Sequence, residues 1–157
     1  MHDHHVLEVA DWSIDPQAVI AGLERLGPVS LVVPAWLHGI DWVGDPHASV
    51  PCAERQLMRL THMAGDAGIE LLHAAVGDPD PLAAIEDACD AVRPDELVLF
   101  VRERRGASLL GLSLAARAGA ATGLSVRRVP VPLAQRRRTG FAWWRLGAGH
   151  CRLEAAR

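Results

Sequence analysis

Short apolar runs rich in β-branched residues alternate with helical patterns along most of the chain, and this alternation constrains the fold more than any other feature. The runs predicted to be strands cover residues 6–10, 29–33, 69–76, 97–101 and 124–129. Nearly unbroken apolar runs of this length are typical of parallel strands that helices cover on both faces. The chain is therefore predicted to be an α/β protein with a doubly wound parallel sheet.

Helix signals lie between all of these runs. Asp15-Pro16 and Asp80-Pro81 each place a capping carboxylate before a proline, the residue favoured at the first helical position. The first of these helices is expected to stop at Gly27-Pro28. The other helices are predicted to span about residues 51–64, 81–92 and 106–123.

The chain is long enough for one domain, and half of its 157 residues are apolar, so it can bury a substantial core. No apolar run approaches the ~18 residues that a membrane span needs, and nothing at the start resembles a secretory signal. A cytoplasmic location without membrane contact is expected. His2, His4 and His5 are expected to belong to a frayed terminus.

No metal site is predicted. The three cysteines are far apart and lack the paired spacing of a Cys-rich zinc site. One loop, from Pro34 to Val50, carries the potential ligands His38, Asp41, Asp45 and His47, but their spacing matches no standard metal site, and a solvated loop is the preferred interpretation.

The charge is unevenly distributed. Residues 1–130 hold ten Arg against 18 Asp and Glu, whereas residues 131–157 hold six Arg against one Glu. We therefore divide the chain into a domain at 1–132 and a basic C-terminal extension at 133–157, which also contains Phe141, Trp143 and Trp144 and could form a hairpin. Its aromatic residues are expected to pack on the body or on a second subunit rather than to bind nucleic acid.

Three places in the chain resemble the universal stress protein family. They are a first strand that ends at Asp11 with Ser13 nearby, the turn Gly77-Asp78-Pro79, and Gly111-Leu112-Ser113 ahead of a final Pro130-Val131. The resemblance covers about residues 5–131 and depends on the order and spacing of these motifs together. It implies a five-stranded parallel sheet of order 3-2-1-4-5.

The resemblance also implies a non-catalytic binding protein that holds an adenine nucleotide, ATP or AMP, at the carboxyl ends of the strands. Asp11 and Ser13 would face the base or ribose, and Gly106, Gly111 and Ser113 would lie near the phosphates. The glycine loop departs from the family pattern, because only four residues separate Gly106 from Gly111 and Leu112 stands where Ser or Thr is expected.

Two alternatives therefore stay open. Asp11 either accepts a hydrogen bond from the nucleotide or only shapes the turn before the next helix. We expect a homodimer in either case. The protein either binds nucleotide or is an interaction module that has lost the pocket and uses the Arg- and Trp-containing extension as its contact surface. A hydrolase is not expected, since the chain has no Gly-x-Ser-x-Gly motif, and the absence of lysine excludes lysine-based catalysis.

Overall fold

Five parallel strands form one sheet in the computed structural model, which describes residues 4–24, 27–37, 45, 47–100 and 113–129. The order β3-β2-β1-β4-β5 and the parallel direction of every pair confirm the predicted doubly wound sheet. The strands are β1 (Val6–Ala10), β2 (Val29–Pro34), β3 (Leu71–Gly77), β4 (Glu96–Phe100) and β5 (Ser125–Arg128).

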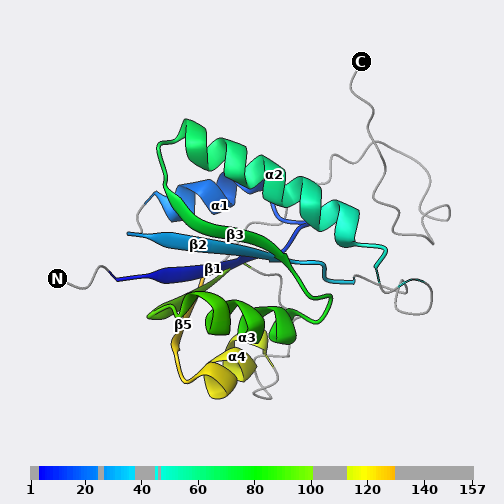
Figure 1. The fold of residues 1–157 in the computed structure, drawn as a ribbon, viewed down its shortest axis with the longest axis vertical. Helices are drawn as coiled ribbons and strands as arrows, with labels where there is room; N and C mark the ends of the chain where they lie inside the picture. The colour runs from blue at the N-terminus through cyan, green and yellow to red at the C-terminus, as the bar shows by residue number, and fades with distance from the viewer. Residues whose placement is uncertain (1–3, 25–26, 38–44, 46, 101–112, 130–157) are drawn as a thin grey trace.

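Helices cover both faces of the sheet (Figure 1). They are α1 (Pro16–Leu23), α2 (Val50–Asp66), α3 (Pro81–Val92) and α4 (Leu114–Thr122). In the view of Figure 1, α1 and α2 lie above the sheet, and α3 and α4 lie below it. The predicted start of the last helix near 106 and the hairpin in the extension lie outside the described residues.

Local capping explains where two of the helices begin. The Asp15 carboxylate accepts a hydrogen bond from the backbone N–H of Gln17 at 3.1 Å, and the Asp80 carboxylate accepts one from Leu82 at 2.9 Å. Pro16 and Pro81 follow these caps, as predicted. The end of α1 differs from the expectation, because the helix stops at Leu23 with Glu24 as its C-cap, ahead of Gly27.

The core consists of two apolar layers, one on each face of the sheet. The layer under α1 and α2 includes Val19, Leu31, Leu60 and Phe100. The layer under α3 and α4 is built from residues such as Leu7, Val9, Ile85, Leu97 and Leu114. The strand β1 lies between β2 and β4 and is buried along its whole length. Its side chains therefore pack alternately into one apolar layer and the other.

Glu8 is an exception within β1. The sequence places it inside an apolar run, and the structure buries it completely, with no hydrogen-bond partner for either carboxylate oxygen among the described residues. Burial raises the pKa of Glu8 well above its usual range, because the charged form cannot be solvated there.

The outer strand β3 is irregular near its start. Its pairing with β2 shifts register between Val29 and Ser30, which face Leu71 and His73 respectively. The residue between them, Leu72, stands at this bulge with 55% of its surface exposed.

His4 and His5 belong to the folded domain, which corrects the expectation of a frayed terminus at these two positions. The backbone N–H of His5 donates to the Asp95 carboxylate at 2.8 Å, and the Asp95 N–H donates back to the His5 carbonyl, also at 2.8 Å. The His4 ring lies 3.2 Å from the Glu96 carboxylate, which also accepts from Arg127 at 3.0 Å. These partners are about 90 residues away in the chain, so local sequence patterns do not reveal them.

A close contact between α1 and the sheet depends on a glycine. A Cβ at Gly22 would come within 2.3 Å of the Phe100 ring, and that ring is fully buried and held by its neighbours. We expect Gly22→Ala to lower the free energy of unfolding by about 1–3 kcal/mol through overpacking, measured by urea denaturation. The matched control is Gly65→Ala in α2, where a Cβ would meet nothing within 4 Å. This control should gain up to about 1 kcal/mol from helix propensity, and equal effects at both positions would contradict the proposed packing.

Candidate functional site

Three of the predicted binding residues, Asp11, Ser13 and Ser113, belong to the described part of the chain and lie beyond the carboxyl ends of the strands. In a doubly wound parallel sheet, ligands bind beyond the carboxyl ends of the strands, at the point where the chain connections leave in opposite directions. In the order β3-β2-β1-β4-β5 that point lies between β1 and β4. Asp11 directly follows β1 there, as the sequence predicts.

Asp11 is fully buried and bound on both sides of its backbone. Its N–H donates to the Phe100 carbonyl at 3.0 Å, which extends the pairing of β1 with β4 by one residue. Its carbonyl accepts from the Ile14 N–H at 3.1 Å and so closes the turn toward α1. These bonds hold the Asp11 side chain at the β1–β4 junction.

The carboxylate of Asp11 shapes this turn. Its Oδ1 accepts one hydrogen bond from the Ser13 N–H at 2.9 Å and another from the Ser13 hydroxyl at 2.8 Å. Asp11 and Ser13, which the sequence places together at the end of the first strand, are therefore joined in one Asx-type turn. The turn interpretation of Asp11 is confirmed, and Oδ2 lies buried beside it. Whether Asp11 also accepts from a nucleotide stays a prediction.

Tryptophan side chains and the start of α2 organise the neighbouring strand end, and the sequence analysis did not identify this arrangement. The Trp12 indole N–H donates to the Trp36 carbonyl at 2.7 Å, across the ends of β1 and β2. The Ser49 hydroxyl, 5% exposed, donates to the Ala35 carbonyl at 2.7 Å. Ser49 precedes α2 but makes no capping bond with its side chain, so its hydroxyl serves to fix the segment after β2.

The helix α4 begins on the same edge of the sheet, since it runs back between the parallel strands β4 and β5. Ser113 caps it: the hydroxyl oxygen accepts from the Ala116 N–H at 3.2 Å, and the residue is 7% exposed. The amides of this first turn carry the partial positive charge of a helix N-terminus, which favours an anion. Gly106 and Gly111, the other two predicted phosphate-binding residues, lie outside the described residues.

Gly77, part of the motif that resembles the family, has a role in packing. A Cβ there would come within 2.6 Å of the Ala84 side chain of α3 and 3.0 Å of Val32. Its backbone carbonyl accepts from the Ala35 N–H at 3.2 Å. The glycine therefore lets α3 approach the ends of β2 and β3 closely.

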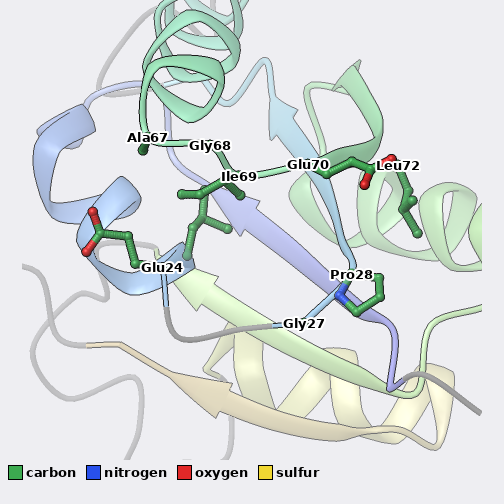
Figure 2. A pocket seen from close by; sticks show the side chains of 9 residues that line it. Glu24, Gly27, Pro28, Ala67, Gly68, Ile69, Glu70 and Leu72 are labelled. Carbon is green, nitrogen blue, oxygen red and sulfur yellow. The ribbon is translucent and has the colours of Figure 1, made fainter.

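A surface pocket lies at the opposite end of the sheet, beside the amino ends of the strands. Its volume is about 560 Å³, and it is lined by the ends of α1 and α2 and by the starts of β2 and β3. Figure 2 shows Glu24 and Glu70 on opposite sides of this pocket with Ile69 between them. Because it lies at the amino ends of the strands, it is remote from Asp11 and is not the crevice that the topology predicts.

A second pocket, of about 590 Å³, lies between α3 and α4 and contains Cys89. Burial, together with the nearby carboxylates of Asp90 and Glu86, raises the pKa of the Cys89 thiol to about 11. The thiol is therefore protonated at neutral pH and packs as a small apolar group against the α3–α4 core layer.

Neither a metal centre nor a membrane span is found in the described residues. No group of three or more His, Cys, Asp or Glu side chains is placed there to hold a metal ion. Likewise, no helix within these ranges is long and apolar enough to cross a bilayer.

Comparisons with known proteins connect this geometry to one fold. No family model matches the chain. No curated protein matches it significantly. Among solved structures, a universal stress protein in complex with cAMP is similar, with a TM-score of 0.57 and 18% identity over 82% of this chain and 98% of that one. A universal stress protein family protein from Arabidopsis thaliana with AMP bound is also similar, with a TM-score of 0.55 and 18% identity over 82% of this chain and 92% of that one. The chain therefore has the universal stress protein fold.

The Ser49–Ala35 bond offers a direct test of how the strand end beside the site is held. We expect Ser49→Ala to lower the free energy of unfolding by about 1–2 kcal/mol, because it leaves a buried carbonyl without its donor. Chemical denaturation measures this loss. Ser125→Ala, on the exposed strand β5, is the matched control and should stay within about 0.5 kcal/mol of the parent. A loss at Ser49 no larger than the loss at Ser125 would show that this hydroxyl does not hold the segment.

Proposed function

We propose that this protein is a non-catalytic member of the universal stress protein family that binds an adenine nucleotide in the crevice between β1 and β4. The observation that carries the proposal is the buried Asp11 at the end of the central strand, on the junction with β4. The two solved structures with the same fold, crystallised with cAMP and with AMP, support an adenine nucleotide as the ligand.

The chemistry of Asp11 suits this role. An ionised carboxylate accepts hydrogen bonds only, and its bonds are stronger than those of neutral acceptors. The donors that a nucleoside offers to it are the ribose hydroxyls and the exocyclic amine of adenine. One carboxylate oxygen orients Ser13, and in the proposal the other oxygen and the Ser13 hydroxyl face the nucleoside.

The phosphate end of the nucleotide is assigned to the start of α4. Ser113 and the first amides of this helix point to the same edge of the sheet as Asp11. Gly106 and Gly111 precede this helix in the chain, and glycines there would let backbone amides approach phosphate oxygens. Arg102, Arg104 and Arg105 in the same segment are further candidates to bind phosphate.

The remaining parts of the proposal come from the sequence and the resemblance. A regulatory role in stress, a cytoplasmic location and the absence of catalysis are what the family implies. ATP and AMP are both candidate ligands, and the choice between them depends on how many phosphates the shortened glycine loop accommodates.

Calorimetric titration with ATP, AMP and cAMP tests the proposal, with Asp11→Asn as the key variant. Asparagine keeps an oxygen for Ser13 but removes the negative charge, so we expect the fold to survive and nucleotide affinity to fall at least about tenfold. Asp80→Asn is the matched control, because the Asp80 carboxylate likewise accepts from the backbone N–H two residues ahead but follows the outer strand β3. Absence of binding by the parent chain at millimolar nucleotide would refute the proposal.

A second candidate function is an interaction module, and the charge distribution is the observation that favours it. The extension at 133–157 is basic, whereas the rest of the chain is acidic. In this proposal the extension binds a second copy of the chain, its arginines meeting the acidic surface and Phe141, Trp143 and Trp144 burying apolar area.

Truncation after residue 132 separates the two candidates. If the extension forms the contact, sedimentation should show a dimer for the full chain and a monomer for the truncated chain. A truncated chain that stays dimeric and still binds nucleotide would show that the extension is not the contact surface. A dimer that dissociates with added salt would agree with the charge argument.

A further inference from the structure

The buried carboxyl of Glu8 has no function in the proposed nucleotide site. Glu8 pairs in register with Leu31 on β2 and with Val98 on β4, and both of these belong to the apolar layer beneath α1 and α2. Its side chain therefore points into the middle of that layer, away from α3 and α4. It is fully buried, and neither carboxylate oxygen has a hydrogen-bond partner in the described part of the chain.

No charged group of the described residues compensates Glu8. The inward residues of α1 are Val19, Ile20 and Leu23, and none of them titrates. The inward side of α2 offers the Gln56 amide, whose N–H donates to the Ile14 carbonyl at 2.9 Å. The buried residues of α2 are Cys52, Ala53, Gln56, Leu60 and Ala64.

The nearest charged groups on this face of the sheet are His4, Glu96 and Arg127. Arg127 lies in register with Val98 on the outer strand β5, one strand beyond, and it bonds to Glu96 at 3.0 Å. His4 is four strand positions from Glu8, and Glu96 is two positions from Val98, the partner of Glu8 on β4. His4 and Glu96 pair with each other. Four residues of strand span ~13 Å, so His4 is too distant to bond to Glu8. Asp15 and Glu24 flank α1, and both carry negative charge, which cannot stabilise a second carboxylate.

We propose that Glu8 is a proton-dependent latch for α1: the neutral carboxyl keeps this helix closed on the sheet, and loss of the proton opens the helix so that the carboxylate reaches water. The open state is then a local rearrangement of one helix, in which the proton released by Glu8 passes to solvent.

The helix α1 is the element expected to open because it is the smaller of the two covering helices. It has eight residues and three buried apolar side chains, whereas α2 has 17 residues and packs against both β2 and β3. Gly22 of α1 lies against Phe100 of β4, so α1 covers the β1–β4 side of this face. Short elements with few buried contacts open at lower free energy than the rest of a domain.

The direction of the pH effect follows from proton binding. In the open or unfolded state Glu8 has the ordinary glutamate pKa of about 4.3. Burial raises the pKa of Glu8 in the closed state. At a pH between the pKa of Glu8 in the open state and its higher pKa in the closed state, the closed state holds a proton that the open state has lost. The closed state is therefore fully favoured at low pH, and opening becomes up to tenfold more frequent for each unit that the pH rises through this window.

Hydrogen exchange measured by mass spectrometry tests the latch on the full chain. At about pH 9, where a buried glutamate can ionise, we expect the peptide 16–24 to exchange at least about tenfold faster in the parent than in Glu8→Gln. At about pH 4, just below the ordinary pKa of a glutamate, the two proteins should exchange alike to within about twofold. Comparing the two proteins at one pH removes the intrinsic effect of pH on amide exchange. The peptides 6–10 and 81–92 should not differ between the proteins.

Two further variants complete the test. Glu8→Leu removes the polar group altogether and should behave like Glu8→Gln, so the test survives if the buried amide impairs folding. Glu86→Gln removes an exposed carboxylate from α3 and should keep the parent's pH profile. Equal exchange of 16–24 in the parent and both Glu8 variants at every pH would overturn the latch. Faster exchange of all peptides together would also overturn it, because it would indicate global unfolding.

Discussion

The position of β1 between β2 and β4 is the constraint on which the rest of the structure depends. A strand with parallel neighbours on both sides has every backbone group paired and both faces covered, so its five residues are all buried. This placement brings Asp11 onto the junction with β4, and it forces Glu8 into the core. The same strand thus positions the candidate binding carboxylate and buries a second carboxyl that has no hydrogen-bond partner among the described residues.

The sequence predicts the architecture well where the signals are local. The two Asp-Pro pairs mark helix starts because a capping carboxylate and a proline at the first position act within three residues of each other. The apolar runs mark the strands because a parallel strand needs apolar side chains on both faces. Strand boundaries are less well predicted: the third strand begins at Leu71 rather than Ile69, since pairing with β2, not composition, decides where it starts.

The candidate site is predicted in part. Asp11 and Ser13 stand out as polar residues after a buried strand, and their shared turn follows from an Asx preference that sequence can suggest. The bonds from Trp12 to Trp36 and from Ser49 to Ala35 cannot be read from the sequence, because they join segments that only the folded sheet brings together. Glu8 is missed for a related reason: one glutamate within an apolar run does not reveal which way it points until the neighbours of the strand are known.

The bulge in β3 has a consequence for how copies of this protein meet in a concentrated solution. An outer strand with a regular ladder of free amides and carbonyls is a template for another strand, and fibrillar association begins at such places. Because Leu72 is displaced from the register, only the backbone from His73 onward offers regularly spaced amides and carbonyls to a second strand. The irregularity therefore protects this side of the sheet from uncontrolled growth, at the small cost of one leucine left in contact with water.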